Sequence, residues 1–290
     1  SVDVVFYRPR HILGDRVHAR FGDEYPIRFD FLDTMEGQNL SLQVHPLTEY
    51  IQSAFGMHYT QDESYYILDC GEDSVVYLGL QENVDKEAML RDLEKAQKSE
   101  ITFDAEKYVN TWPAKKHDHF LIPAGTIHCS GADTMVLEVS ATPYIFTFKL
   151  WDWGRVGLDG LPRPVHLEHG GKNIQWDRTT SWVKENLVNQ KETLHEDENV
   201  TVERTGLHER EFIETRVYTI HTACEMECEG GVSSCNVVEG KGAVIESTDG
   251  SFEPYEVHYA ETFIIPASVK HFVIRPLDGS VKVLRATVRG

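Results

Sequence analysis

Short stretches in which apolar and polar residues alternate recur through most of this chain. Alternation with a period of two is typical of β-strands with one buried face, because successive side chains point to opposite sides of a sheet. Turn sequences such as CGED and PAG separate most of the stretches, and many short strands at this spacing predict an all-β sandwich or barrel. In the first half of the chain the predicted strands are residues 27–33, 40–46, 64–70, 74–80, 118–124, 135–141 and 144–151.

Two segments depart from the strand pattern. Residues 83–99 contain good helix formers and place Ala88, Leu90 and Leu93 on roughly one face, which predicts a small helical insertion. A second helical piece is predicted within residues 180–189. The sequence around it is polar and rich in loop-forming residues, as is typical of a connection between two β units.

One turn sequence of the first half recurs in the second half. Residues 118–131 and 261–274 both read as an apolar strand, then Ile-Pro-Ala, a short turn and a histidine. This histidine is His128 in the first copy and His271 in the second, each five residues after the proline. The similarity predicts two copies of one antiparallel jelly-roll barrel.

Composition limits the class of partner. The chain has 290 residues, enough for two domains, and its net charge of −19 opposes binding to nucleic acid or to an acidic membrane surface. No apolar run approaches the roughly 18 residues that a membrane span needs, and the start of the sequence does not resemble a secretion signal. The five cysteines are odd in number and scattered. We therefore expect buried free thiols and a cytoplasmic location.

Four polar residues on or beside three different predicted strands are candidate metal ligands: Gln43, His45, Glu63 and His128. Gln43 and His45 are two residues apart, so their side chains project to the same side of an extended strand. Inward-facing residues of neighbouring strands converge in a small barrel. Two imidazoles, a carboxylate and an amide oxygen suit zinc, or else iron or manganese.

Simpler alternatives exist for these histidines. His45 alone could be a hydrogen-bonded core histidine, since most lone histidines on strands are. His117 and His119 form a second pair that could chelate an ion, although the charged neighbours Lys115 and Lys116 indicate a solvated strand entry.

The second barrel lacks a comparable ligand set, because neither a Q-x-H nor an H-x-H pair precedes His271. We therefore predict a metal-binding barrel in residues 1–155, a connecting segment in residues 156–205 and a metal-free barrel in residues 206–290. In this scheme His271 belongs to the ordinary packing of the second barrel.

Four segments together resemble the type I mannose-6-phosphate isomerases, specifically the short bacterial form with two cupin barrels. They are LSLQVHPLTEY (40–50), ESYYILD (63–69), FLIPAGTIHCSG (120–131) and LWDWGRVGLDGLPRPVHLE (150–168). Their order and approximate intervals agree with the family over residues 21–170, and the agreement is weaker from there to the C-terminal end.

The resemblance implies a single zinc ion held by Gln43, His45, Glu63 and His128, and isomerisation of an aldose to a ketose through an enediol. It also implies a base and a charge-stabilising group near the metal. The candidates for these roles are Glu138 and Lys149, both on strands that follow the last ligand.

This chain departs from the family at positions that are usually basic. Lys149 stands where the family has arginine, while Gln61 and Asp30 each stand where it has lysine. Asp62 adds a negative charge, and the stretch 139–146 carries one extra residue before Lys149. A phosphate group near these acids would be repelled, so the metal site is predicted and the phosphate site is doubtful.

Three functions remain open from the sequence. The first is a zinc-dependent isomerase of the mannose-6-phosphate type, acting on mannose 6-phosphate or a related sugar. The second is a non-catalytic paralogue that binds or senses a sugar, and the third is another cupin metalloenzyme, such as an iron dioxygenase. The expected partner is a small sugar or sugar phosphate, without nucleic acid or membrane, and the expected assembly is a monomer or homodimer.

Overall fold

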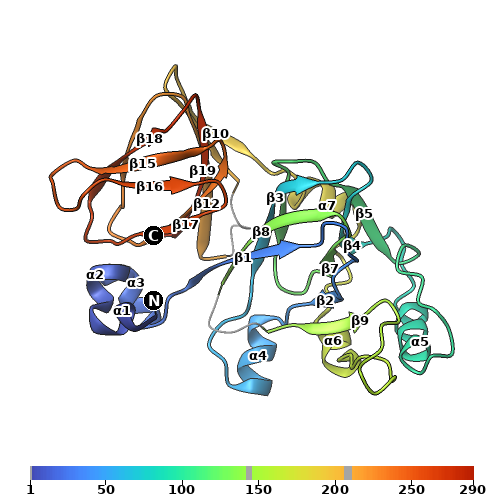
Figure 1. Cartoon of the computed structure of the whole chain (residues 1–290). Coiled ribbons are helices and arrows are strands. Elements are labelled where there is room, and N and C mark those ends of the chain that lie inside the picture. The colour runs from blue at the N-terminus through green and yellow to red at the C-terminus, as the bar shows by residue number, and fades with distance from the viewer. Residues whose placement is uncertain (1, 142–145, 206–210) are drawn as a thin grey trace. The chain divides into compact units, whose positions relative to one another are not determined.

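The structure is a computed structural model that describes residues 2–141, 146–205 and 211–290 (Figure 1). It divides into two compact units, the first formed by residues 30–190 and the second by residues 1–29 together with residues 191–290. Both consist mainly of antiparallel strands, which confirms the predicted cupin-like all-β class.

The first unit contains two packed layers of strands and several short helices. One sheet has the order β1-β8-β3-β6 and the other the order β5-β4-β7-β2-β9. The strands are β1 (Ile27–Asp33), β2 (Leu42–Val44), β3 (Glu63–Cys70), β4 (Val75–Leu80), β5 (Val109–Pro113), β6 (His119–Ile122), β7 (His128–Ser130), β8 (Thr134–Ala141) and β9 (Phe148–Trp151). The helices are α4 (Thr48–Phe55), α5 (Lys86–Gln97), α6 (Leu167–Asn173) and α7 (Thr180–Asn186).

Helix α5 confirms the predicted insertion and shifts its buried face. Asp85 caps the helix by accepting a hydrogen bond from the backbone N–H of Ala88 at 2.9 Å. The buried residues are Met89, Leu93 and Ala96, so the stripe that faces the core starts one residue later than predicted. Met89 and Leu93 pack in the same apolar cluster as Leu42 of β2, which anchors the helix to the layer that carries Gln43.

The second unit is also a sandwich of two sheets. The sheets have the orders β10-β11-β12-β19-β14-β17 and β13-β18-β15-β16. Their strands are β10 (Glu192–Glu196), β11 (Val200–Arg204), β12 (Ile213–Ile220), β13 (Cys224–Glu227), β14 (Ser233–Glu239), β15 (Gly242–Ser247), β16 (Tyr255–His258), β17 (Thr262–Ile265), β18 (His271–Pro276) and β19 (Val281–Val288). Side chains of both sheets, among them Val237, Ile245, Phe272 and Val283, form one buried core.

Three short helices that the sequence analysis missed belong to the second unit (Figure 1): α1 (Val2–Tyr7), α2 (Pro9–Leu13) and α3 (Asp15–Phe21). They are tied to β19 by a hydrogen bond of 2.9 Å from Arg16 Nη2 to the carbonyl of Val288, and Leu13 and Val17 are buried. The predicted domain boundaries differ from these compact units. Residues 1–29 group with the C-terminal strands, and residues 156–190 group with the first unit because α6 and α7 pack on its strands.

Two further expectations have clear outcomes. All five cysteines are free, and Cys70 is half-buried while the other four are buried, which confirms the predicted thiols. His271 is not part of the barrel packing as predicted, because its side chain is 49% exposed and lies 3.9 Å from Glu225. Strand alternation explains this position, since the next residue, Phe272, points into the core.

The predicted strand 144–151 starts outside the described residues, and its described part is β9. Four of the eight residues of the stretch 139–146, residues 142–145, likewise lie outside them. Across the described part of the chain, none of the helices has the length and apolarity needed to span a membrane.

Candidate metal centre

Neighbouring strands of the first unit bring the predicted ligands together. Gln43 of β2 lies opposite His128 of β7 on one side and opposite Lys149 of β9 on the other, both in antiparallel register. Directly opposite residues project from the same face of a sheet. The three side chains therefore form a row on one face, and His45, two residues after Gln43, extends it.

Glu63, the first residue of β3 in the other sheet, meets this row. His45 Nε2 lies 3.1 Å from Glu63 Oε2, and His128 Nε2 lies 3.0 Å from Glu63 Oε1. One ligand atom from each of the three residues lies within 4.8 Å of the others, and all three side chains are buried. Gln43 Nε2 lies 3.2 Å from His128 Nε2, and a half-turn of the terminal amide brings its oxygen to this point.

The hydrogen bonds made by the Nδ1 atoms of His45 and His128 determine which kind of ligand their Nε2 atoms can bind. His45 Nδ1 lies 2.8 Å from the carbonyl oxygen of Phe146, and His128 Nδ1 lies 2.9 Å from that of Thr126. A carbonyl only accepts, so each Nδ1 carries the proton and donates it. In the neutral rings each Nε2 then turns its lone pair toward the Glu63 carboxylate.

Lone pairs that face a buried carboxylate repel it unless positive charge lies between them, which either a proton on Nε2 or a bound metal ion can supply. Consistent with this, His45 Nε2 and Glu63 Oε1 make no hydrogen bond within the described residues despite the short distances. Histidines that bind metals commonly donate their other N–H to a carbonyl in this way. Two imidazole nitrogens and a carboxylate suit Zn²⁺ and related divalent ions, so these residues fit a metal.

The electrostatics of the cluster agree with its geometry. Burial alone would lower the pKa of His45, but the charge of Glu63 and the interaction with it outweigh burial and raise that pKa. Burial alone would raise the pKa of Glu63, but His45 and His128 lower it well below the usual carboxyl range. Glu63 is therefore ionised, and its buried negative charge favours positive charge at the two imidazole rings.

The turn between β6 and β7 positions His128, the first residue of β7, and it requires glycine at residue 125. Gly125 has a φ of +86°, in the left-handed region, and a Cβ built on it would lie 2.6 Å from Gln175 Cγ and 2.9 Å from Leu47 Cδ2. Its backbone N–H donates to the carbonyl of His45 at 2.9 Å. The turn that positions His128 is thus joined directly to the backbone of a second predicted ligand.

Gln61, seen in the sequence only as a departure from the family, belongs to this site. Its Nε2 donates to Glu63 Oε2 at 3.0 Å and lies 3.5 Å from Glu138 Oε1, while its oxygen accepts from the backbone N–H of Phe146 at 2.8 Å. Glu138 is opposite Tyr65 in the β3–β8 register, and Tyr65 shares a face with Glu63. The site therefore includes the predicted Glu138.

Two buried hydroxyl groups on this face were not predicted. Tyr65 is fully buried, and Ser140 lies opposite Glu63 in the β3–β8 pair. Within the described residues neither hydroxyl makes a hydrogen bond. Burial, followed by the charges of Glu63 and Glu138, raises the pKa of Tyr65, so it stays protonated. The spacing of Tyr65 two residues after Glu63 was the available sequence signal. Unsatisfied buried hydroxyls beside a metal-binding cluster suit a ligand rich in hydroxyl groups.

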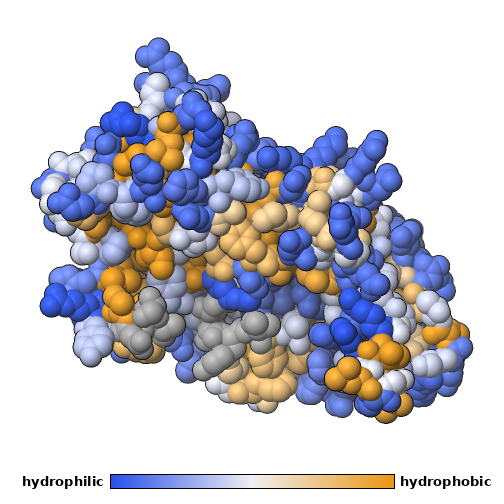
Figure 2. Space-filling view, in the orientation of Figure 1, coloured by the Kyte–Doolittle hydropathy of each residue, from blue (hydrophilic) through white to orange (hydrophobic). Residues whose placement is uncertain are grey.

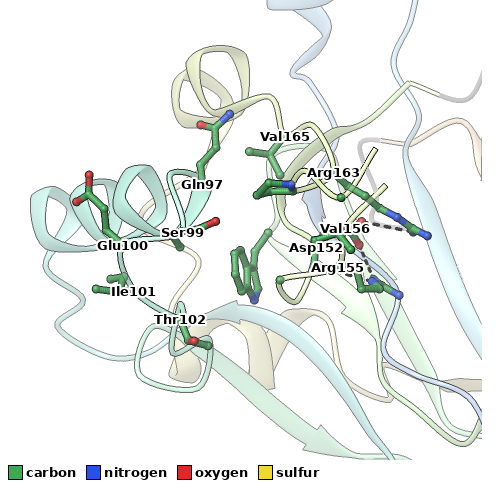
Figure 3. Close-up of a pocket in the computed structure, with 15 residues that line it drawn as sticks. Gln97, Ser99, Glu100, Ile101, Thr102, Asp152, Arg155, Val156, Arg163 and Val165 are labelled. Carbon is green, nitrogen blue, oxygen red and sulfur yellow. Dashed lines mark hydrogen bonds and ion pairs between the residues drawn. The ribbon is translucent and has the colours of Figure 1, made fainter. Parts of the chain in front are cut away.

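A separate cavity of the first unit, about 420 Å³ in volume, lies between the end of α5 and residues 151–165 (Figure 3). Its lining includes none of the four predicted metal ligands. Buried Asp152 accepts from Ser41 Oγ at 2.8 Å and forms ion pairs with Arg155 and, at 3.6 Å, with Arg163. These contacts fix the segment after β9. Figure 2 shows hydrophobic side chains at the surface near it, and Leu158 is fully exposed.

Comparisons with known proteins show which proteins this chain is similar to in sequence and in fold. No family model matches the sequence. The chain is 25% identical over 236 residues to mannose-6-phosphate isomerase ManA of Bacillus subtilis (strain 168), covering 81% of this chain and 67% of that protein. It is 22% identical over 289 residues to the mannose-6-phosphate isomerase of Streptococcus mutans, covering 98% and 79%. The crystal structure of the Bacillus subtilis mannose 6-phosphate isomerase matches with a TM-score of 0.78 at 20% identity, over 97% of this chain and 80% of that one, so the two share a fold.

Proposed function

Since this chain is an isomerase and a divergent member of the mannose-6-phosphate isomerase family, we propose that it interconverts an aldose and a ketose of the mannose 6-phosphate and fructose 6-phosphate type with one Zn²⁺ per chain. The buried group of His45, Glu63 and His128 is the observation that carries this proposal. Its nitrogen and carboxylate donors support zinc over the harder divalent ions.

In this proposal the amide oxygen of Gln43 completes the ligand set with His45, Glu63 and His128. The bound ion would offset the negative charge that develops on the sugar oxygens during the reaction. The remaining chemistry belongs to side chains of the protein.

Glu138 is the proposed base. Its carboxylate removes the proton from C2, next to the C1 carbonyl, and returns it to C1, while the hydroxyl proton on the C2 oxygen passes to the C1 oxygen. The aldose becomes a ketose with no net change in protons. Its burial beside Gln61 supports this role, because a base screened from water does not lose the proton to solvent during the transfer.

Lys149 is the proposed stabiliser of negative charge on the sugar. Its place in the row with Gln43 and His128 supports this role, since its side chain projects from the same face of the sheet as these two predicted ligands. Tyr65 and Ser140 supply hydroxyl groups that can orient those of the sugar. We also propose a cytoplasmic location, which the free cysteines support.

The test is a coupled assay of fructose 6-phosphate formation from mannose 6-phosphate by protein whose zinc content has been measured. Free mannose is assayed in parallel, because the surrounding acids make the need for phosphate an open question. Turnover of either sugar supports the proposal. Saturable sugar binding without product would favour the sensing alternative, and no turnover of either sugar by fully loaded protein would refute the isomerase proposal.

A further inference from the structure

Three arginines lie side by side across neighbouring strands of the second unit. Arg204 of β11 is opposite Arg216 of β12, and Arg216 is opposite Arg285 of β19, all in antiparallel register. Such residues share one face of the sheet, and their Cβ atoms are about 5 Å apart. Like charges in this arrangement repel one another unless counter-charges lie close by.

Two of these arginines, Arg204 and the central Arg216, have counter-charges. Arg204 forms an ion pair with Glu192. The guanidinium of Arg216 lies 2.6 Å from Glu214 and 3.7 Å from Glu229. The repulsion along the row is therefore offset at Arg204 and Arg216 by acidic groups of the protein itself.

Arg285 differs from them. It is only 4% exposed, and its hydrogen bonds go to neutral acceptors, the hydroxyl of Ser233 at 3.0 Å and the carbonyl of Glu227 at 2.6 Å. No acidic side chain in the described parts of the chain forms an ion pair with it. A guanidinium keeps its charge in proteins, and a buried charge without a partner is costly.

The thiols around Arg285 do not supply the missing charge. Cys235 lies opposite Arg285 in the β14–β19 pair, and Cys224 and Cys228 are the other two cysteines of the unit. Burial raises the pKa of all three thiols and takes that of Cys235 to about 12, so they are neutral near pH 7.

A cavity of the second unit adjoins this end of the sandwich. It has a volume of about 460 Å³, within the range of small-molecule sites, and its lining includes Arg16, Glu214, Arg216, Glu229 and Thr287. A recess of about 10 Å³ continues it to Arg285 between Arg216 and Thr287. Around the cavity and recess, arginines outnumber acidic residues by two, in a chain whose net charge is −19.

We propose that the cavity of about 460 Å³ is an oxyanion site, in which Arg16 and Arg216 bind the phosphate or carboxylate group of a small molecule at the end where the recess leads to Arg285. Guanidinium groups hold such oxyanions through paired, charge-assisted hydrogen bonds. Arg285 lines the recess and gains the counter-charge that it lacks. Arg16 approaches from α3, where it donates to the Val288 carbonyl at 2.9 Å and makes no ion pair with described residues. The site is independent of the metal centre and of the proposed isomerase activity.

The test is calorimetric titration of the full chain with inorganic phosphate and, separately, with malonate, at an ionic strength held constant with sodium chloride. Saturable binding of either anion is expected, and the tighter one identifies the group recognised. Arg285→Met and Arg16→Ala should each weaken binding about tenfold. Arg275→Ala is the matched control, because Arg275 is an exposed arginine of the same unit that pairs with Glu246 at 3.1 Å. It should leave binding unchanged.

Two further comparisons distinguish this site from the metal centre and from unspecific attraction of anions to surface arginines. Arg16 is exposed, so Arg16→Ala keeps the test decisive even if Arg285→Met does not fold. Removal of metal with a chelator should not change anion binding, because the cavity and the recess contain none of the metal ligands. The proposal is overturned if neither anion binds, if Arg275→Ala weakens binding as much as Arg16→Ala does, or if binding disappears with the metal.

Discussion

The side-chain amide of Gln61 joins the carboxylate of Glu63 to that of Glu138, with its Nε2 at 3.0 Å from Glu63 Oε2 and 3.5 Å from Glu138 Oε1. A neutral amide thus bridges two buried acids at a position where the resemblance to the family leads one to expect lysine. The bridge orients both carboxylates and adds no positive charge. We therefore predict that residue 61 influences how well the site accepts a phosphorylated sugar.

Gln61→Lys should shift substrate preference toward phosphorylated sugar. A new ammonium group near the site attracts a phosphate by about 1 kcal/mol in partly screened surroundings, which corresponds to roughly a fivefold increase in the ratio of kcat/KM for mannose 6-phosphate to that for mannose. Gln61→Met is the control, because it removes the amide and adds no charge. An equal change of the ratio in both variants would contradict the electrostatic explanation.

Glu138→Gln should abolish most of the isomerase activity and leave metal binding intact. Loss of a general base typically lowers kcat by about 10²- to 10⁴-fold, and glutamine keeps the size of the side chain and its contact with Gln61. The measurements are kcat and zinc content on the same sample. If kcat stays near that of the parent protein, the proton is carried by another group.

The variants Lys149→Met and Lys149→Arg distinguish the effect of the positive charge of Lys149 on kcat from the effect of its shape. If Lys149 stabilises charge on the sugar, methionine should lower kcat by about 10²-fold, and arginine should retain at least a tenth of the parent value because it keeps the charge. Near-equal losses in the two variants would mean that an ammonium group in particular is required. No loss with methionine would remove Lys149 from the mechanism.

Acidification should destabilise the first unit partly through His166. Partial burial, then the charge of Lys149, then that of His169 lower the pKa of His166 below 6.5 in the folded chain. The contribution of neutral His166 to the free energy of unfolding is complete above pH 6.5. It is lost as the pH falls through the lowered pKa that His166 has in the folded chain, because the unfolded chain binds the proton first. The backbone N–H of Lys149 donates to His166 Nδ1 at 3.2 Å, and an asparagine oxygen can also accept this hydrogen bond. Urea unfolding at two pH values, one on each side of this window, should therefore show a smaller acid-induced loss of stability for His166→Asn. An NMR titration that finds the His166 pKa at or above 6.5 would contradict this prediction.

The strands could be predicted from the sequence because alternation is a local property. Residues 27–33 form β1 as predicted, and the runs near residues 64–70 and 135–141 form β3 and β8. β7 was missed because it consists of only three residues, too few for a period-two pattern. Helices α1 to α3 were missed for a related reason, since each is short and its position depends on packing against strands far along the chain.

The buried group of His45, Glu63 and His128 could be predicted from the sequence, and its surroundings could not. Gln43 and His45 can be identified by their spacing on a strand. The role of Gln61 depends on a register that brings β3 beside β8, which no local pattern encodes. The lack of an acidic partner for Arg285 among the described residues likewise could not be predicted from the sequence. The neighbours of this arginine depend on the pairing of β12 with β19, which the local sequence does not reveal.

The most direct test is the zinc content per chain after chelator treatment, reloading with zinc and removal of excess metal. The parent protein should hold one zinc per chain, and Glu63→Gln should hold almost none, because the carboxylate between His45 and His128 is then gone. His271→Ala, at the corresponding histidine of the second unit, should bind zinc like the parent. Undiminished zinc in Glu63→Gln, or a parent protein that takes up none, would contradict the assignment of this cluster as a metal centre.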